Sequence, residues 1–422
     1  MDGSKVAGTL MISSELHHRP AILVILALTY AGIALGKIPG LKLNRTGIAL
    51  LGAISMMIFG GVSTPEVVSY INWPTIFLLF GFFVISAQLR LSGFYTLVAE
   101  GISARLGHPA QFLLVLMVVT AGLSAFLNND IVCFVFTPIV GAALLRRQLN
   151  PLPFLIGLAI ASNVGAAATL VGNGQDMMIG QVAHLNFGSY LLWSIVPVLF
   201  ALGCGYGIIW MMSHKNIQSS APVPKDLDPQ AYPYDRLHTI KGLVTLVVVI
   251  GLFFSPLPKE VIALAAAALH IASPKFRTED LLGLVDWPVL ILFMGLFVVT
   301  GSLQSTGYGD QAVQWLAHGG CDLNAPPTLI AATATLSNLI NNSAAVMLLL
   351  KVIDLSHPTT AYILALANSF GGNLIVIGSV ANIIVVQQAQ QMGITIGFRA
   401  FARLSIPVTL VALGGLLLWV IC

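Results

Sequence analysis

The chain has 422 residues, of which 57% are hydrophobic and only 8% are charged, and its formal net charge is +3. A soluble domain carries about 25% charged residues, so this composition excludes a chain whose whole surface faces water and predicts one embedded in a lipid bilayer. The basic residues are scattered rather than gathered in one stripe, which excludes a nucleic-acid partner. The four cysteines have neither metal-ligand spacing nor a pairing pattern, so we expect no metal site and no cofactor.

Hydrophobic runs of about 17–25 residues predict membrane-spanning helices. Residues 1–19 lack the basic start of a signal peptide, and we expect them to remain as a short extracytoplasmic tail. The first half, 20–213, has predicted helices at 20–36, 45–62 and 73–91, a broken stretch at 111–147, an interrupted helix at 152–184 and a helix at 190–212. A polar connector, 214–239, precedes the second half, 240–422, with predicted helices at 240–256, 259–273 and 287–304, a broken stretch at 328–351, an interrupted helix at 360–390 and a helix at 400–421.

The two halves repeat one another residue by residue. Trp73-Pro74 and the glycine, aromatic and aliphatic positions up to Gly93 recur from Trp287-Pro288 to Gly307 at a constant offset of 214 residues. Ser162-Asn-Val-Gly165 through Gly172 matches Asn368-Ser-Phe-Gly371 through Gly378 at an offset of 206. A polar break at matching positions of two halves is typical of secondary transporters built on structural repeats.

The most informative part of the repeat is a pair of polar breaks inside long apolar runs. They are Ser124-Ala-Phe-Leu-Asn-Asn-Asp130 and Ser337-Asn-Leu-Ile-Asn-Asn-Ser343. If each is the tip of a re-entrant hairpin that enters and leaves on one side, each half crosses the membrane five times, and the second half lies inverted relative to the first. With both termini outside and the connector inside, all 19 basic residues except Lys5, Arg19, Lys259 and Lys351 fall on the inner side, as the positive-inside rule requires.

The predicted fold is therefore an all-α integral membrane protein of two inverted-topology repeats, each with five transmembrane helices and one hairpin. Irregular backbone survives at membrane depth only where protein or a water-filled cavity covers it, so we expect the binding site at the hairpin tips and the interrupted helices. The candidate substrate-binding residues at these breaks are Asn128, Asn129, Asn163, Gly172, Asn173, Gln175, Ser337, Asn338, Asn341, Asn342, Asn368, Ser369, Asn373, Ser379 and Asn382.

Two carboxylates are also expected at membrane depth, Asp130 and Asp176, and their repeat counterparts are Ser343 and Asn382. An ionisable residue inside the membrane is by default functional, so we expect these two to couple transport to an ion, either H⁺ or Na⁺. No Lys or Arg lies within the four breaks. Any substrate charge must therefore be met by amides and helix N-termini, or the substrate is nearly neutral.

These motifs resemble those of the ion transporter superfamily, which includes arsenite efflux pumps, D-type sodium/proton antiporters, and divalent-anion and citrate transporters. Asn129-Asp130 followed by Thr137-Pro138-Ile139-Val140, together with Asn341-Asn342, is similar to the hairpins of the arsenite pumps, although Ile131 replaces a glycine. Ala168-Thr-Leu-Val-Gly-Asn-Gly-Gln-Asp-Met-Met-Ile179 is similar instead to the antiporter branch and to bacterial anion permeases. The Ser-Asn-Thr hairpin signature of the sodium-coupled dicarboxylate branch is absent from both hairpins.

The resemblance implies an elevator-type secondary transporter, in which hairpins and broken helices move against a scaffold, and it allows a homodimer through the scaffold helices. We expect transport of a small inorganic oxyanion or weak acid, with proton-driven arsenite or antimonite export as the leading case. The alternatives are a sodium/proton antiporter, an inorganic anion or carboxylate permease, and a passive channel.

The expected location is the bacterial inner membrane, as a multi-pass protein. We expect no enzyme activity. Tyr234-Asp235 and Gly307-Tyr-Gly-Asp310 imitate the motifs of intramembrane aspartyl proteases, but the predicted topology puts the two carboxylates on opposite sides of the membrane.

Overall fold

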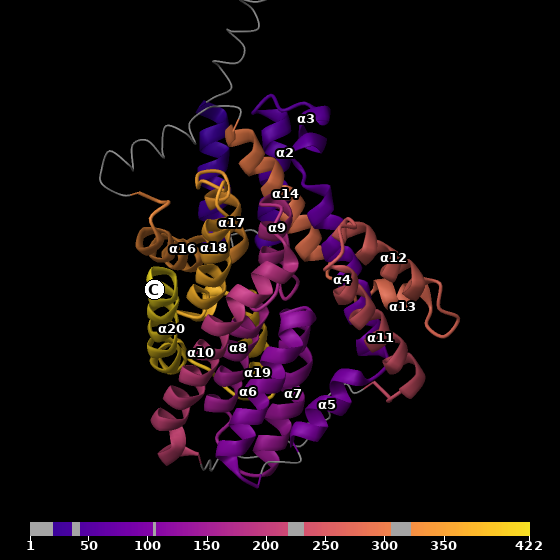
Figure 1. Cartoon of the computed structure of the whole chain (residues 1–422), viewed down its shortest axis with the longest axis vertical. Coiled ribbons are helices and arrows are strands. Elements are labelled where there is room, and N and C mark those ends of the chain that lie inside the picture. The colour runs from indigo at the N-terminus through magenta and orange to yellow at the C-terminus, as the bar shows by residue number, and fades with distance from the viewer. Residues whose placement is uncertain (1–19, 36–42, 104–106, 218–231, 305–321) are drawn as a thin grey trace, which may run out of the picture.

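The computed structural model describes residues 20–35, 43–103, 107–217, 232–304 and 322–422, and these residues are helical with connecting turns and no strand (Figure 1). The predicted tail 1–19, most of the connector 214–239 and the Gly307–Asp310 motif lie outside the described residues. The all-α class expected from the sequence is confirmed for the described part of the chain.

In the first half, the described residues form an N-terminal helix Pro20–Leu35 and nine further α-helices. These are α2 (Arg45–Ile58), α3 (Thr64–Tyr70), α4 (Trp73–Leu91), α5 (Phe94–Ser103), α6 (Pro109–Phe126), α7 (Asn129–Arg146), α8 (Leu152–Ala166), α9 (Gly174–Val182) and α10 (Phe187–Ser213), which a short 3₁₀ turn, η1 (His214–Asn216), follows.

The second half begins after the connector. Its described helices are α11 (Arg236–Leu252), α12 (Lys259–Ile271), α13 (Thr278–Leu282), α14 (Trp287–Gln304), α16 (Pro326–Ile340), α17 (Asn342–Leu349), α18 (Pro358–Gly371), the 3₁₀ turn η2 (Val376–Gly378), α19 (Val380–Gln391) and α20 (Phe398–Ile421).

Local sequence explains where the helices differ from the predicted spans. The span expected at 45–62 ends at Ile58, and a separate short helix, α3, begins after Ser63. The Glu66 carboxylate accepts from the Ser63 backbone N–H at 2.7 Å, which is one half of a capping box, and Pro65 occupies the first turn, where it costs no hydrogen bond. The short helices α5 and α13 occupy segments that were expected to be loops.

One group of helices, called here the scaffold, pairs the two halves crosswise. Helix α4 of the first half packs against α12 of the second, and α14 of the second packs against α2 of the first. A Cβ added at Gly81 on α4 would lie 2.6 Å from the Cβ of Ala263, and one added at Gly295 on α14 would lie 2.8 Å from the Ala49 carbonyl carbon. Both the glycines and their partners are related by the offset of 214, so the same close contact occurs twice.

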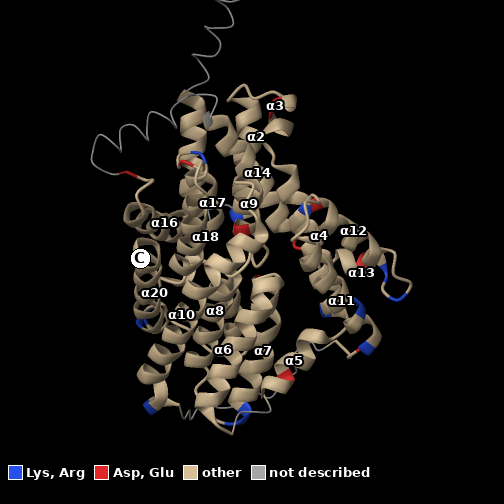
Figure 2. Ribbon diagram, viewed as in Figure 1, with Lys and Arg blue, Asp and Glu red and all other residues tan. Residues whose placement is uncertain are grey.

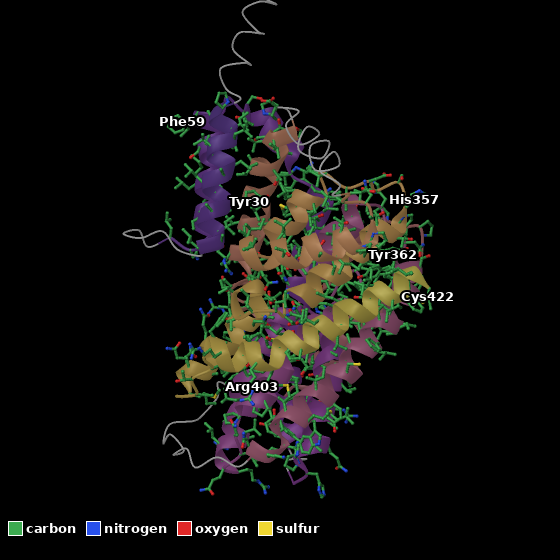
Figure 3. All side chains as sticks on the ribbon, turned by 90° about the vertical axis from the view of Figure 1, so that its left-hand side faces the viewer. Tyr30, Phe59, His357, Tyr362, Arg403 and Cys422 are labelled. Carbon is green, nitrogen blue, oxygen red and sulfur yellow. The ribbon has the colours of Figure 1, made fainter. Side chains whose placement is uncertain are left out.

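The helices α6–α10 and α16–α20, called here the transport group, pair both within and between the halves. Helix α6 packs on α8 and α16 packs on α18, while α7–α19, α9–α17 and α10–α20 join the two halves. Figure 3 shows α20 crossing the molecule obliquely, with Arg403 toward one end and Cys422 at the other.

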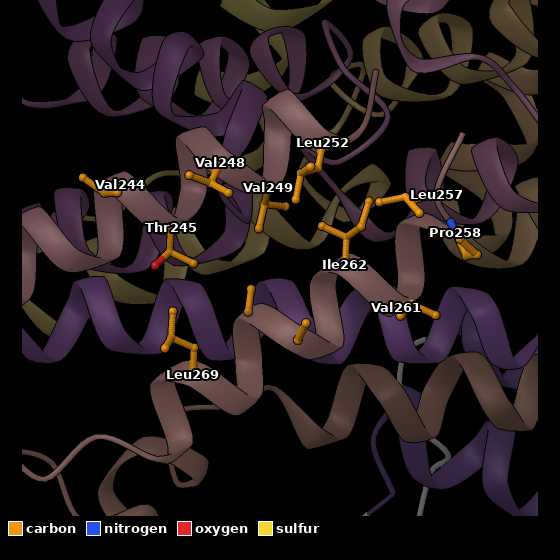
Figure 4. A pocket seen from close by; sticks show the side chains of 12 residues that line it. Val244, Thr245, Val248, Val249, Leu252, Leu257, Pro258, Val261, Ile262 and Leu269 are labelled. Atoms are coloured by element: carbon orange, nitrogen blue, oxygen red, sulfur yellow. The ribbon is translucent and has the colours of Figure 1, made fainter. Parts of the chain in front are cut away.

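The outer surface of the bundle suits a bilayer. Among the described residues, α4, α6, α7, α10 and α20 are long and apolar enough to span a membrane individually, and several shorter apolar helices accompany them. Charged residues are sparse and lie mostly toward helix ends and loops (Figure 2). An apolar groove of about 480 Å³ runs between α11 and α12, lined by residues such as Val248, Leu252 and Leu269 (Figure 4).

Candidate functional site

The first break lies between α6 and α7. Helix α6 ends at Phe126, and Asn128 caps α7 by accepting hydrogen bonds from the backbone N–H groups of Asp130 at 2.8 Å and Ile131 at 3.3 Å. Asparagine is among the most favoured N-cap residues because its side-chain oxygen reaches the free N–H groups of the first turn. The Asn128-Asn129 pair therefore starts a new helix in the middle of an apolar run.

Asn129 ties this hairpin tip to the interrupted helix that follows. Its backbone N–H donates to the Gly172 carbonyl at 3.2 Å, and its side-chain amide donates to Asn163 Oδ1 at 3.2 Å. Its own carbonyl accepts from the Ser162 hydroxyl at 3.3 Å. Gly172 is needed here because an added Cβ would lie 2.6 Å from the Ser124 carbonyl oxygen.

Asn163 on α8 is the centre of a network that joins the two halves. Its amide nitrogen donates to Asn373 Oδ1 at 2.8 Å and to Asn382 Oδ1 at 3.1 Å. Its oxygen accepts from Asn129 and from the Ser379 hydroxyl, the latter at 2.9 Å. All four polar positions of this buried amide are thus used, which is the condition for a stable buried polar group.

A second network surrounds Asp176 on α9. Asn173 caps this helix by accepting from the Asp176 N–H, and its amide donates to Asp176 Oδ2 at 2.7 Å and to the Ser369 hydroxyl at 3.2 Å. Ser369 also donates to Asp176 Oδ2 at 3.5 Å. One position before Asp176, Gln175 donates to the Ser343 hydroxyl of the second hairpin at 2.7 Å.

The second break lies between α16 and α17 at Asn341, whose φ of 84° is in the left-handed region. Asparagine tolerates that region better than most residues, and the Asn341 side chain caps α17 by accepting from the Ser343 N–H at 3.0 Å. Asn338 donates to the Gly371 carbonyl at 2.7 Å and accepts from the Ile375 N–H at 3.3 Å. The second hairpin is therefore tied to the backbone around η2.

Several buried polar atoms of this region have no hydrogen-bond partner within the described residues. They are both side-chain polar atoms of Asn368, Asn341 Nδ2, Asn342 Oδ1 and Asp176 Oδ1. Buried polar groups in native proteins are nearly always satisfied, by protein, by water or by a ligand. The amide atoms of Asn341, Asn342 and Asn368 supply both donors and acceptors, which a small polar solute requires.

Asp130 differs from Asp176 in its surroundings. It is half-buried in the first turn of α7, and the Asp286 carboxylate at the start of α14 is close enough to act on it electrostatically. Asp286 itself accepts from the Val289 N–H at 3.1 Å. The two expected ion-coupling carboxylates thus occupy distinct environments, one at the boundary with the scaffold and one inside the transport group.

The structure brings most of the candidate residues into these two networks. Asn128, Asn129, Asn163, Gly172, Asn373, Ser379 and Asn382 belong to the first, and Asn173, Gln175, Asp176 and Ser369 to the second. Ser337, Asn338, Asn341 and Asn342 lie at the second hairpin, and Ser337 donates to the Ala334 carbonyl.

The candidate set omits Ser162 and Ser343, which bond to Asn129 and Gln175. Their repeat equivalence to Asn368 and Asp130 is the sequence signal that marks them.

These contacts link the N-terminal ends of four half-helices, α7, α9, α17 and α19, across the two halves. Free N–H groups and the positive end of the helix dipole favour electron-rich oxygens at such ends. Among the described residues, no group of three or more His, Cys, Asp or Glu is placed to hold a metal ion. The arrangement can bind a small polar oxygen compound and exchange a proton or a monovalent cation at a carboxylate.

Broken helices around a buried polar centre in an all-helical membrane protein are typical of membrane transporters. The crystal structure of the YdaH transporter from Alcanivorax borkumensis has the same fold, with a TM-score of 0.59 at 14% identity over 96% of each chain. The citrate transporter family model, CitMHS, matches residues 21–362, and the chain belongs to that family.

Two of the similar proteins cover most of the chain, and a third covers part of it. An uncharacterized transporter from Mycobacterium tuberculosis is 29% identical over 412 residues, which is 92% of this chain and 96% of that protein. The silicon efflux transporter LSI3 of Oryza sativa is 24% identical over 423 residues, covering 84% of this chain and 87% of its own. A putative transporter, arsB, of Dictyostelium discoideum is 31% identical over 162 residues, covering 38% and 29%.

Proposed function

We propose that this chain is a cation-coupled secondary transporter for a small inorganic oxyanion or weak acid, with proton-driven export of arsenite or antimonite as the leading case. The observation that carries the proposal is the buried set of amides and hydroxyls at the four breaks, with two carboxylates nearby and no Lys or Arg within the breaks. A weak oxyacid that is uncharged near pH 7 presents hydroxyl groups that donate and accept hydrogen bonds. Asn368, Asn341 and Asn342 offer such a solute both kinds of partner.

The substrate class is favoured over a tricarboxylate on electrostatic grounds. Moving an ionised carboxylate out of water costs several kcal/mol unless a cation or several donors replace the water, and a multiply charged acid would need basic side chains that these breaks lack. Two relatives, named as a silicon efflux transporter and as putative transporter arsB, also favour small inorganic solutes.

The unequal contacts of the scaffold with the transport group support an elevator mechanism. Arg45 and Lys259 are equivalent at the offset of 214, and each donates to a backbone carbonyl of the transport group: Arg45 to Ile377 at 3.5 Å and Lys259 to Leu185 at 3.3 Å. Under the offset of 206, the equivalent of Ile377 is Val171 rather than Leu185. The transport group therefore sits off the symmetric midpoint, as one end state of an elevator requires.

Other contacts at the same boundary agree with that displacement. Gly174 faces both Leu79 and Phe293, which are repeat equivalents, so the first half's broken helix occupies the centre of the scaffold. A cavity of about 320 Å³ separates the two groups, with Phe297 on the scaffold side and Met347 on the transport side. Lys351 also lines this cavity, and the orientation predicted from the basic residues places Lys351 on the outer side, so the cavity lies toward the outside in this state.

The test is transport by purified protein in vesicles with an imposed pH gradient. Arsenite or antimonite should accumulate against its own gradient when protons flow the other way, and counterflow should occur without a gradient. Sodium-driven proton movement without arsenite transport would support the sodium/proton antiporter instead, uptake of citrate or sulfate the permease, and ohmic currents without counterflow a channel.

The role of Asp130 is tested in the same vesicles. Asp130→Asn removes the charge that faces Asp286 and keeps the size of the side chain, so we expect a folded protein that has lost pH-driven accumulation. Asp354→Asn is the matched control, because this carboxylate lies in an exposed loop and, among the described residues, accepts hydrogen bonds only from Ser356. If Asp130→Asn shows pH-driven accumulation at the level of that control, the coupling role is excluded.

A further inference from the structure

The repeat relation between Asp176 and Asn382 identifies an atom with an unusual environment. Under the offset of 206, Asn163 corresponds to Ser369 and Asn173 to Ser379. The two cross-half contacts obey this relation, because Asn173 donates to Ser369 and Ser379 donates to Asn163.

The acceptor oxygens of the two residues obey it as well. Asn382 Oδ1 accepts from Asn163 at 3.1 Å, and Asp176 Oδ2 accepts from Ser369 at 3.5 Å. One donor to a side-chain oxygen is thus equivalent in the two halves, and Asp176 Oδ2 has a second donor, Asn173.

The second polar atoms of the Asn382 and Asp176 side chains differ in their hydrogen bonding. Asn382 Nδ2 donates to the carbonyls of Gly372 at 2.9 Å and Ile375 at 3.4 Å. The corresponding atom of Asp176 is Oδ1, which is buried in a side chain with 0% exposure and has no partner within the described residues. The corresponding carbonyls belong to Ala166 and Thr169.

The backbone around these carbonyls is equivalent too. An added Cβ at Gly378 would lie 2.7 Å from the Gly372 carbonyl oxygen, and one at Gly172 would contact the Ala166 carbonyl oxygen in the same way. Under the repeat relation, Asp176 Oδ1 corresponds to the Asn382 atom that donates to such carbonyls. A carboxylate oxygen has no hydrogen to donate to a carbonyl, whereas a protonated carboxyl has one and matches an amide in shape and donor position.

We propose that Asp176 is a proton-binding site of this transporter, in addition to the coupling carboxylate proposed at Asp130, and that in the state described here its Oδ1 carries the proton and donates it to the Ala166 carbonyl, as the Asn382 amide donates to Gly372. The inference rests on the proposed function and names the coupling ion. The step is a reversible proton transfer: the carboxylate takes up H⁺ from the solution on one side of the membrane and releases it to the other side, with no redox change.

A proton fits this position better than sodium. Asp176 Oδ2 is already held by two donors, Asn173 and Ser369, which would compete with a cation for that oxygen. Elements α4, α17 and α18 pack against α9, and their only Asp, Glu, Lys, Arg or His residue is Arg90, whose guanidinium lies over the Phe134 ring.

The titratable neighbours of Asp176 carry no charge of their own at pH 7. Tyr190 of α10 acts on Asp176 electrostatically, and its hydroxyl donates to the Ala167 carbonyl at 2.8 Å. Tyr362 of α18 lies against the Tyr190 ring. When the proton leaves, the Asp176 charge therefore has no cationic partner among these groups. Because a buried charge without a partner is unfavourable, proton release is coupled to a rearrangement of α8 and α9.

The experiment measures the proton directly and separates this inference from the proposed function. Infrared difference spectra of the purified protein against pH should show the carbonyl stretch of a buried protonated carboxyl group, which Asp176→Asn removes and Asp354→Asn and Asp130→Asn retain. In vesicles, Asp176→Asn mimics the protonated form, so substrate counterflow should persist while pH-driven accumulation is lost. Asp176→Ala, which lacks the donor, should lose both.

Each contrary result has its own meaning. A band that persists in Asp176→Asn, or pH-driven accumulation by Asp176→Asn at the wild-type level, overturns the assignment and leaves the proposed function standing. If sodium raises the Tm of the wild-type protein by the same amount at every pH, and Asp176→Asn abolishes this increase, the proton assignment is overturned in favour of a sodium site. Absence of transport by the wild-type protein for every solute tested refutes the proposed function, while the infrared result still decides the protonation of Asp176.

Discussion

Substitutions of Asn163 and Asn368 can distinguish an amide that stabilises the fold from an amide that binds the substrate. Both side chains are buried, on α8 and on the corresponding helix α18. Asn163 makes four hydrogen bonds, whereas both polar atoms of Asn368 lack a partner within the described residues. We therefore expect opposite consequences from Asn163→Ala and Asn368→Leu.

The magnitudes follow from the partners left behind. Asn163→Ala leaves four groups without this partner: the amide of Asn129, the hydroxyl of Ser379 and the side-chain oxygens of Asn373 and Asn382. Each buried polar group left unsatisfied costs about 1–3 kcal/mol. Even if only two of the four remain unsatisfied, the free energy of unfolding falls by about 2–6 kcal/mol. Asn368→Leu breaks no described hydrogen bond and replaces an amide by an apolar group of similar size, so its effect on stability is within about 1 kcal/mol of zero.

The assay compares thermal unfolding of the purified variants in detergent with transport in vesicles. Asn163→Ala should lower Tm clearly, whereas Asn368→Leu should keep Tm near that of the wild type and lose substrate transport. The reasoning is refuted if Asn368→Leu lowers Tm as much as Asn163→Ala does, or if Asn368→Leu transports normally. The first result would mean that Asn368 is structural, and the second that its unpartnered atoms do not contact the substrate.

Two further predictions concern stability. Gly165 packs directly on the Ala121 backbone, so Gly165→Ala should lower Tm. At Gly122 on α6 an added Cβ meets nothing within 4 Å, so Gly122→Ala should raise the free energy of unfolding by about 0.4–1 kcal/mol. Equal effects of the two substitutions would contradict the close packing at Gly165. Hydrogen bonds from His238 and the Lys275 ammonium lower the pKa of Asp235 to about 2, so its stabilising effect is present above its unfolded pKa near 4 and is lost as the pH falls toward 2. Asp235→Ala should lower Tm at pH 7 and lose that acid dependence in Tm measured from pH 5 to pH 2; an unchanged pH profile would show that Asp235 does not contribute.

The positions of the helices could be predicted closely because each is encoded locally. Apolar runs of membrane length, the prolines at the first turns of α4, α6 and α16, and the asparagines before α7, α9 and α17 all act within a few residues. The all-α membrane fold and the transporter family expected from these patterns are confirmed. Short helices such as α5 and α13 escaped prediction because they lie outside the spans, where hydropathy carries no signal.

The inverted arrangement of the halves, the orientation in the membrane and the identity of the site residues remain predictions. Periodicity and spacing placed Asn163 and Asn368 in the same class, as polar residues at a helix break. Their hydrogen bonding separates them, and it depends on residues more than 200 positions away, such as Asn373 and Ser379 for Asn163. A partner at that separation is decided by how the halves pack, which no local pattern reports.

The sequence by itself determined that this is an all-helical membrane protein with four polar breaks, because hydrophobicity and capping act through the solvent and the nearest residues. Only the tertiary structure decided which polar atoms find partners, because that depends on crosswise packing between the halves. The difference is clearest at Asp176 and Asn382: the sequence placed them at equivalent positions, and only the packing shows that Asp176 Oδ1 has no partner among the described residues while Asn382 Nδ2 donates to the Gly372 carbonyl. At this position a carboxyl in one half and an amide in the other give the two halves different hydrogen bonding.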